Sequence, residues 1–270
     1  MRPEEPAAPY GDDFGPEAVA RWFQEEAAYH DRFQGGRVDR YPAPYAVFDD
    51  AYLFRGRFRP RPGEAVLDFG CAEGLALARW RRRQPFRYVG VDASPALLEA
   101  ARARVPDGDF RLMPDSGRIP AADGEFTAVV VLGVLHHVPT VSRYLAELGR
   151  VLAPGGRLFL REPVHAMGRR PGSGQARPGL SPNERGIPLP FLVRTLTTLG
   201  LEVETARYAF AAPAVLAMRL LHTPARAPWE LVRLADGLFT RALGTRVPYE
   251  RPRLADKLYP TVGYLVARKP

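Results

Sequence analysis

The segment Val66–Gly74 (VLDFGCAEG) places a short apolar run, a glycine-containing turn and the start of a helix next to one another. Ala65–Phe69 has the length and the apolar composition of a buried strand. Gly70 and Gly74 lack a Cβ, so the backbone can turn sharply there and approach a ligand closely. Because α/β folds bind ligands where a strand passes through such a turn into a helix, this segment predicts a ligand site.

The rest of the chain alternates between strand and helix patterns. We expect seven strands, at Ala65–Phe69, Tyr88–Val91, Phe110–Met113, Thr127–Val134, Arg157–Arg161, Leu201–Tyr208 and Val262–Ala267. The helices expected between them are Leu75–Arg83, Ser94–Val105, Val141–Leu152 and Pro190–Leu199. This alternation predicts an α/β fold with a doubly wound, Rossmann-like sheet of parallel strands and helices on both faces.

Three segments lie outside this alternation. Residues 1–63 begin with a loose tail and continue with helical spacing from Pro16, and residues 164–187 form a long polar loop. Residues 209–258 interrupt the cofactor domain that we expect over residues 64–208 and 259–270. We expect the apolar residues of this insertion to form the core of a small helical cap: Phe210, Leu216, Met218, Leu220, Leu221, Trp229 and Phe239. The alternatives are that the insertion forms the wall of an apolar acceptor pocket or a dimer contact. One face of its second half carries Leu231, Leu234, Ala235, Leu238 and Ala242.

Composition excludes several classes of protein. The 270 residues suffice for one or two domains, and the only cysteine, Cys71, excludes an internal disulfide and a cysteine metal cage. The net charge of +8 comes almost entirely from arginine, because Lys257 and Lys269 are the only lysines, and this argues against a nucleic-acid footprint. No apolar run could span a bilayer and Met1–Tyr10 has no signal-peptide pattern, so we expect a cytoplasmic protein.

A carboxylate follows the glycine turn at the distance expected for a nucleotide site. Asp92 directly follows the last residue of the strand Tyr88–Val91. At that position it can accept hydrogen bonds from both hydroxyls of a ribose. Together with the turn, Asp92 predicts a cofactor that contains adenosine.

With these residues in place, the chain resembles the class I S-adenosylmethionine-dependent methyltransferases of the small-molecule type. The resemblance lies in the order and spacing of VLDFGCAEG, YVGVDAS, FTAVVVLGVLHHVP and LGRVLAPGGRLFLREP, within residues 64–207, and TVGYLVARKP closes the fold. It implies S-adenosylmethionine as cofactor and an N-terminal helical lid. Two positions depart from the family pattern: Ala72 replaces its middle glycine, and Thr127 replaces an acidic residue that supports the fold.

The resemblance implies cofactor contacts for eleven residues. They are Asp68, Gly70, Cys71, Ala72, Gly74, Asp92, Ala93, Asp115, Ser116, Leu132 and Gly133. Asp68 would orient the turn or meet the methionine amino group, and the turn itself would pack under methionine and adenosine. Asp92 would bind the ribose, Ala93 would lie against the adenine, and the residues at 115 and 116 would reach the adenine edge. Leu132 and Gly133 would border the methionine and the methyl group.

Methyl transfer from a sulfonium needs alignment and the exclusion of water more than covalent help. A hydroxyl acceptor also needs a general base, for which histidine is suited near neutral pH. His136 and His137 follow the fourth strand and His165 follows the fifth, so these three are the candidate bases. The alternative is that the pair only caps its strand. His30 is expected to pack on the first helix or contact substrate, and no residue pattern indicates a metal.

The acceptor is expected to be a small molecule, with O or N as the methylated atom. Loop 164–187 is rich in groups that bind acidic or hydroxyl-rich compounds: Arg169, Arg170, Arg177, Asn183, Glu184 and Arg185. A solvated loop is the alternative. We expect a monomer or a homodimer. Three other functions remain open: an RNA methyltransferase, a nicotinamide-dependent oxidoreductase and a non-catalytic regulator that binds the cofactor.

Overall fold

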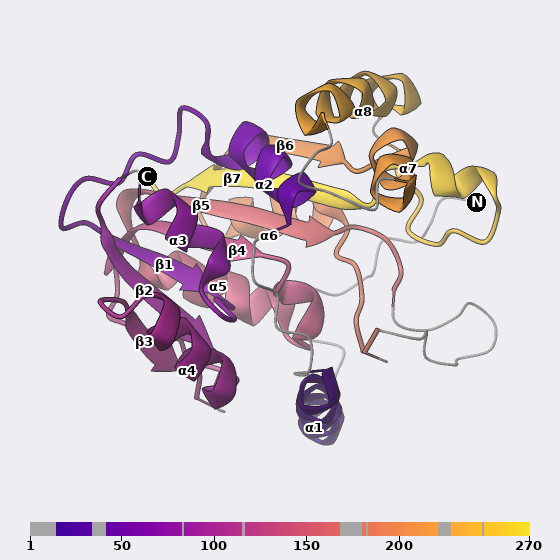
Figure 1. The fold of residues 1–270 in the computed structure, drawn as a ribbon. Coiled ribbons are helices and arrows are strands. Elements are labelled where there is room, and N and C mark those ends of the chain that lie inside the picture. Colours follow the sequence, from indigo (N-terminus) through magenta and orange to yellow (C-terminus); the bar gives the residue numbers. More distant parts are fainter. Residues whose placement is uncertain are drawn as a thin grey trace.

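A computed structural model describes residues 15–33, 42–82, 84–114, 117–167, 180–181, 183–220, 228–244 and 246–270. Its centre is a seven-stranded sheet in the order β3-β2-β1-β4-β5-β7-β6 (Figure 1). The strands are β1 Ala65–Phe69, β2 Arg87–Asp92, β3 Asp109–Leu112, β4 Phe126–Leu132, β5 Leu152–Pro163, β6 Glu202–Ala209 and β7 Val262–Arg268. The predicted doubly wound sheet is confirmed, because the order reverses direction at β1 and β4.

One strand runs against the others. β7 is antiparallel to both β5 and β6, whereas we expected a parallel sheet. Residues 210–261 leave β6 at its carboxyl end and enter β7 at that same edge, so β7 has to return in the opposite direction. The insertion therefore lies at the carboxyl edge of the sheet, where the predicted cofactor residues also end.

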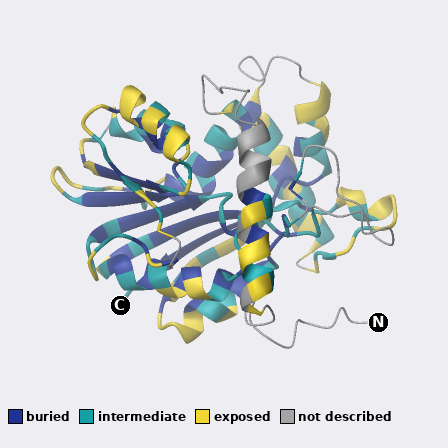
Figure 2. Ribbon diagram, turned by 90° about the horizontal axis from the view of Figure 1, so that it is seen from below, coloured by how far each residue is buried: buried dark blue, intermediate teal, exposed yellow. Residues whose placement is uncertain are grey.

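Helices cover both faces of the sheet, and each face has its own apolar core (Figure 2). On one face, α5 (Val141–Val151) and α6 (Leu189–Thr198) pack on alternate residues such as Leu67 and Val129. On the other face, α3 (Leu75–Arg81) and α4 (Pro95–Arg104) pack on the strand residues that alternate with these and point to the opposite side of the sheet. Buried parallel strands explain the continuous apolar runs that predicted them.

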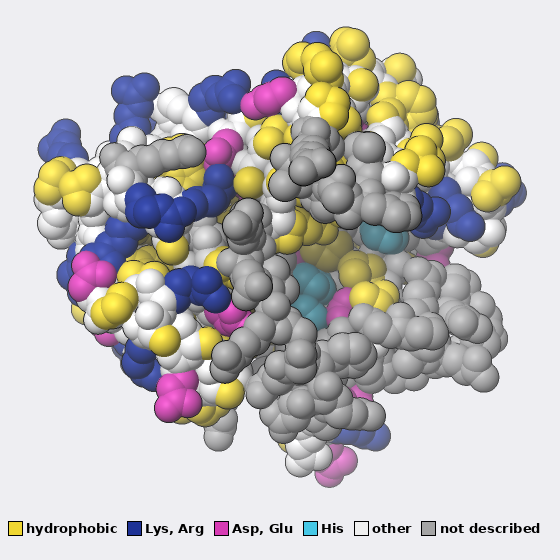
Figure 3. Space-filling view, viewed as in Figure 1, with side chains coloured by type: hydrophobic (Ala, Val, Ile, Leu, Met, Phe, Trp, Pro, Cys, Tyr) yellow, Lys and Arg dark blue, Asp and Glu magenta, His cyan; other side chains and the backbone are white. Residues whose placement is uncertain are grey.

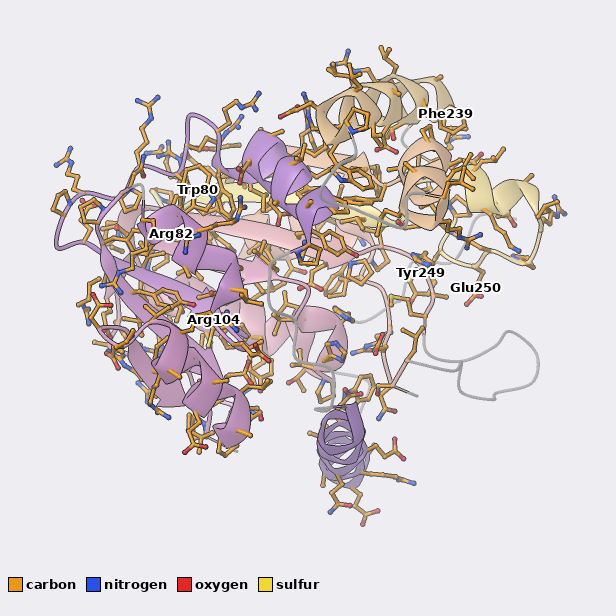
Figure 4. All side chains as sticks on the ribbon, in the orientation of Figure 1. Trp80, Arg82, Arg104, Phe239, Tyr249 and Glu250 are labelled. Atoms are coloured by element: carbon orange, nitrogen blue, oxygen red, sulfur yellow. The ribbon has the colours of Figure 1, made fainter. Side chains whose placement is uncertain are left out.

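The N-terminal region adds α1 (Pro16–Phe33), α2 (Ala43–Asp49) and a π-helical turn, η1 (Asp50–Phe54). The turn places Phe54 in the core beside α3, where its ring packs on that of Trp80 at 5.4 Å between centroids. The indole of Trp80, labelled in Figure 4, donates to Asp50 Oδ1 at 3.2 Å. These contacts attach the segment before β1 to the cofactor sheet.

Strand ends differ from the predicted ones near the candidate site. β4 ends at Leu132 rather than at Val134, because Gly133 takes a left-handed φ of 76° and turns the chain into a short 3-10 helix, η2 (Leu135–His137). β5 is longer than predicted and begins directly at the end of α5. Among the described residues, no helix has the length and apolar character needed to cross a bilayer.

The insertion forms α7 (Ala212–Leu220), α8 (Trp229–Leu243) and a 3-10 turn, η4 (Ala255–Leu258). Phe210 and Trp229 are buried, as expected for a cap. The prediction that its other apolar residues form the core of the cap is wrong for Leu216, Met218 and Leu220, because these side chains are exposed. Leu231, Leu234 and Leu238, which the spacing places on one face of α8, are exposed as well. The apolar face of α8 points away from the molecule.

A buried carboxylate holds the insertion on the sheet. Asp236, in the middle of α8, accepts backbone hydrogen bonds from Phe210 at 2.9 Å and Ala211 at 2.8 Å. Burial raises the pKa of Asp236 to about 6, although these N–H donors favour its charged form. Phe210 has a left-handed φ of 58°, so this anchor stabilises a conformation that its side chain disfavours.

Replacing Asp236→Ala leaves two buried N–H groups without an acceptor. We expect the free energy of unfolding to fall by about 2–4 kcal/mol, measured by urea denaturation. Asp123→Ala is the control, because its exposed carboxylate pairs with Arg150 at the surface and should contribute under about 1 kcal/mol. Equal losses in the two variants would contradict the anchoring role.

Candidate active site

Asp68 is buried under the glycine turn. Its Oδ2 accepts a hydrogen bond from the hydroxyl of Tyr88, on the neighbouring strand β2, at 2.6 Å. Burial raises the pKa of Asp68 to about 7, with a further contribution from the charge of Asp92, and the Tyr88 bond opposes both. A cation placed beside Asp68 would favour its charged form.

The turn after β1 is tight for a physical reason. A Cβ at Gly70 would lie 2.3 Å from a methyl carbon of Val134, so no other residue fits between the turn and the chain after β4. Cys71 is buried, and its burial raises the pKa of its thiol. Its role is packing, as a small apolar residue.

Asp92 is tied to this turn. Its Oδ2 accepts from the backbone N–H of Ala72 and its Oδ1 from that of Ser94, each at 2.9 Å. Each carboxylate oxygen has a further lone pair, and Asp92 is only half-buried, so it can still accept from a ligand. Asp92 therefore shapes the turn in addition to its predicted role toward ribose.

Ala72 stands where the resembled family has glycine, and the backbone shows the consequence. Its φ is 45°, in the left-handed region that residues with a Cβ disfavour. The next residue, Glu73, is fixed by Arg104 at the end of α4 (Figure 4), whose guanidinium lies 2.9 Å from the Glu73 carboxylate. The turn keeps a strained residue because contacts on both sides hold it.

Charged residues meet at the ends of β4 and β5. Arg161 pairs with the buried Asp49 of α2 at 3.3 Å, donates to the carbonyl of Leu132 at 3.1 Å and lies over the ring of Tyr45 at 4.3 Å. A Cβ at Gly133 would lie 3.6 Å from Arg161 Nη2 and 3.7 Å from Cε1 of His136. Gly133 therefore leaves space between these two side chains.

Glu162, the next residue on β5, faces the opposite side. Its Oε1 accepts from the backbone N–H groups of Val134 and Leu135, both at 2.8 Å, and its Oε2 lies 2.9 Å from Nδ1 of His136. A carboxylate only accepts, so Nδ1 of His136 donates and Nε2 keeps its lone pair. The ring atom of His136 nearest to a Cβ at Gly133 is Cε1, the carbon between the two ring nitrogens.

His137 contacts the N-terminal helix instead. Its Nδ1 lies 3.1 Å from the buried Glu26 of α1, and its carbonyl accepts from the indole of Trp22 at 2.9 Å. Burial lowers the pKa of His137, but the hydrogen bond to Glu26 and the charges of Glu184, Glu26 and Glu162 outweigh it, so the net pKa is raised. The Glu26–His137 pair is therefore strongest below that pKa and weakens as the pH rises through it.

The described parts of loop 164–187 also contact α1. Arg185 lies over the Trp22 ring at 5.1 Å, Asn183 donates to Glu25 at 2.7 Å, and Ser181 bonds to Glu26. These contacts use two of the groups that we expected to recognise an acceptor, Asn183 and Arg185. The predicted Arg169, Arg170 and Arg177 lie outside the described residues.

Most of the predicted site residues lie along one edge of the sheet. The turn after β1, Asp92, Gly133 and the pair His136–His137 all follow the carboxyl ends of neighbouring strands. Figure 3 shows histidine side chains in a hollow at this edge. His165 follows β5, where its backbone packs against Gly186. The predicted Asp115 and Ser116 fall outside the described residues, as does the side chain of His30.

Sequence reasoning missed the charged residues that support this edge. Arg161, Glu162, Asp49 and Glu26 are all buried at under one tenth exposure. A signal was present, because Arg161 and Glu162 end an otherwise apolar strand, where buried charges need partners. The partners could not be found, since Asp49 and Glu26 come from helices more than a hundred residues away.

The residues at this edge fit S-adenosylmethionine. The buried Asp68 carboxylate suits an ammonium group, Asp92 has lone pairs left for hydroxyls, and the absence of a side chain at Gly133 leaves room beside His136. No cluster of three or more His, Cys, Asp or Glu side chains able to hold a metal occurs among the described residues.

Comparison with known proteins finds that this part of the chain is similar to methyltransferases. Residues 67–160 match the model of a methyltransferase domain. The chain is 36% identical over 106 residues to demethylmenaquinone methyltransferase of Tropheryma whipplei. The aligned residues cover 38% of this chain and 43% of that protein. It is 34% identical over 105 residues to 27-O-demethylrifamycin SV methyltransferase of Amycolatopsis mediterranei, covering 37% and 39%. It is 35% identical over 103 residues to probable tRNA methyltransferase 9B of Mus musculus, covering 37% and 22%.

The matches span less than half the length of each of these relatives. Solved structures extend the likeness in fold to nearly the whole chain. The [4+2]-cyclase SpnF has a TM-score of 0.57 at 19% identity and covers 94% of this chain and 96% of its own. Geranyl diphosphate methyltransferase, in complex with GPP and sinefungin, has a TM-score of 0.57 at 14% identity, covering 94% and 98%. The predicted class I methyltransferase resemblance is confirmed.

Because Ala72 has a left-handed φ, Ala72→Gly should remove strain at the turn. We expect the free energy of unfolding to rise by about 0.5–1 kcal/mol, since the relief of about 1–2 kcal/mol exceeds the added entropy of the unfolded chain. Ala76→Gly, in the helix that follows, is the matched control and should lower it by about 1 kcal/mol. Urea denaturation measures both, and a loss in Ala72→Gly would contradict the strain.

Proposed function

We propose that this chain, whose residues 67–160 belong to the methyltransferase domain family, transfers a methyl group from S-adenosylmethionine to an oxygen or nitrogen atom of a small molecule. The observation that carries the proposal is a histidine with a buried carboxylate behind it, next to Gly133 at the cofactor edge of the sheet. When bound, S-adenosylmethionine supplies an electrophilic methyl group on its sulfonium. The chain has to bind and align both molecules, exclude water and remove one proton.

The cofactor would be held by the residues of the first two strand ends. Asp68 would take the methionine ammonium, and Asp92 would accept from the ribose hydroxyls while it holds the backbone of Ala72. Leu132 and Gly133 would border the methyl group, on the side where His136 lies. The predicted contacts of Asp115 and Ser116 with adenine stay predictions.

Of the three candidate bases, His136 has the geometry that the role needs. Glu162 holds its Nδ1 proton in place, so Nε2 is free to accept a proton from an acceptor hydroxyl or amine. The carboxylate then stabilises the imidazolium that forms. His137 instead contacts Glu26 and positions α1 as a lid over the site, which keeps water away from the reacting atoms.

A small-molecule acceptor is favoured over RNA by where the described arginines lie. At the site, Arg161 is bound to Asp49 and Arg185 is engaged with Trp22. A groove of about 340 Å³ that is lined by Arg57, Arg59, Arg61 and Arg157 lies at the amino ends of β1, β4 and β5, the opposite edge of the sheet. Arginines there cannot deliver a nucleotide to Gly133. The family match favours methyl transfer over the oxidoreductase alternative.

The proposal is tested with the purified chain, S-adenosylmethionine and a panel of hydroxylated, carboxylated and amino acceptors beside tRNA. We expect micromolar affinity for S-adenosylmethionine by isothermal titration calorimetry, and S-adenosylhomocysteine formation with a small acceptor but not with tRNA. Failure to bind the cofactor below millimolar concentration would remove the proposal. Turnover on tRNA alone would replace it with the RNA alternative.

The assignment of the base is tested by Glu162→Gln. The new amide can still accept from Val134 and Leu135, but its NH₂ faces Nδ1 of His136, which forces the proton onto Nε2. We expect kcat to fall by about 10²–10⁴-fold with cofactor affinity retained.

Glu26→Gln is the matched control, because it makes the same change behind His137. It should lower the pKa of His137 and loosen the lid, which raises KM, but it should leave kcat within a few fold. If Glu26→Gln abolishes turnover while Glu162→Gln does not, the base is His137 instead.

A further inference from the structure

Exposed large apolar side chains are concentrated on one part of this molecule. Among the described residues, ten leucines and methionines are at least 38% exposed, and only Leu112 and Leu199 lie outside the insertion. The other eight lie on α7, α8 and η4 or, for Leu254, directly before η4: Leu216, Met218, Leu220, Leu231, Leu234, Leu238, Leu254 and Leu258. Figure 3 shows hydrophobic side chains gathered over these elements. A patch of this kind on a folded protein marks an interaction surface.

The part of the patch on α8 has a regular pattern. Leu231, Leu234 and Leu238 are 65%, 53% and 69% exposed, and Ala235 and Ala242 are exposed on the same face. Spacings of three and four residues place these side chains in one stripe along the helix. Such a stripe is the surface that a second helix packs against, and the alanines allow that helix to approach closely.

This face cannot turn inward to bury itself, because the opposite face of α8 is already used. Trp229 is 4% exposed, and Asp236 is fully buried and bound to the backbone of Phe210 and Ala211. Rotating the helix would break both hydrogen bonds and expose a tryptophan. No described part of the chain covers the stripe, so it is exposed to a partner surface.

The charges at the two ends of the stripe are opposite. Glu230 precedes it and is half-exposed, with Arg55 at 3.3 Å and Arg233 at 2.8 Å. Arg241 follows it and is exposed, and no carboxylate pairs with it among the described residues. A stripe with an acid at one end and a base at the other is complementary to its own antiparallel copy.

We propose that α8 is a homodimer interface in which two copies pack antiparallel about a two-fold axis at Ala235. In this register Leu231 of each helix lies level with Leu238 of the other to within about one residue, or 1.5 Å. Arg241 comes level with Glu230 to within the same distance. The interface lies on the insertion, away from the glycine turn, so each subunit keeps its own cofactor site.

Cysteine cross-linking tests the register. With helix axes about 10 Å apart and Cα atoms about 2.3 Å from each axis, the two copies of residue 235 lie about 5 Å apart, within disulfide range. Copies of residue 231 lie about 12 Å apart along the axis, which is too far. The native Cys71 is buried, and its burial raises the pKa of its thiol, so it gives little background.

We expect Ala235→Cys to form covalent dimers under mild oxidation and Leu231→Cys alone to form none. An equal mixture of Leu231→Cys and Leu238→Cys should yield the mixed dimer. Self-linking of both Leu231→Cys and Ala235→Cys would overturn the antiparallel register, because every residue lies level with its own copy in a parallel pair.

The oligomeric state tests the interface itself. We expect the unmodified chain to sediment as a dimer in analytical ultracentrifugation, and Leu238→Glu to weaken dimerisation at least a hundredfold with cofactor affinity unchanged. Leu199→Glu is the control, because Leu199 is 39% exposed and lies outside the patch, at the end of α6. A monomeric unmodified chain would overturn the proposal. Binding of that monomer to vesicles with anionic lipids would assign the patch to a membrane surface instead.

Discussion

The buried carboxylate of Glu162 is the contact on which the candidate site depends. It accepts two backbone N–H groups from the turn after β4 and one from the ring of His136, so its three bonds set the end of one strand and the orientation of one side chain together. A carboxylate that is only 1% exposed would be costly without such donors. Because it receives three, it becomes a rigid support for the residues that face Gly133.

Arg161 and Glu162 show how one strand can organise two sides of a site. Adjacent residues of a strand point to opposite faces, so Arg161 reaches α2 while Glu162 reaches η2. Both lie next to the end of β4, where Leu132 pairs with Arg161. The N-terminal helices are thereby tied to the carboxyl edge of the sheet, α2 through Asp49 and α1 through the neighbouring His137 and Glu26.

Local patterns were sufficient for the fold because each one reflects a local cause. The apolar run at Ala65–Phe69 and the glycine at position 70 correspond to a buried strand and a turn with no space for a side chain. The sequence also predicted the apolar stripe of α8, but not whether this stripe faces the sheet or the solvent. Periodicity reports that one side of a helix is apolar, whereas the Asp236 anchor decides which side faces the sheet.

By itself, the sequence determined the doubly wound sheet, the glycine turn with Asp92, and the strand ends at which the candidate residues gather, because backbone geometry links these features over a few tens of residues. The tertiary structure alone decided that β7 runs antiparallel, that Glu162 and not a nearer acid supports His136, and that Glu26 holds His137. Pairings of this kind join residues that are 26 to 111 positions apart. They depend on how packed elements bring side chains together, which no local pattern contains.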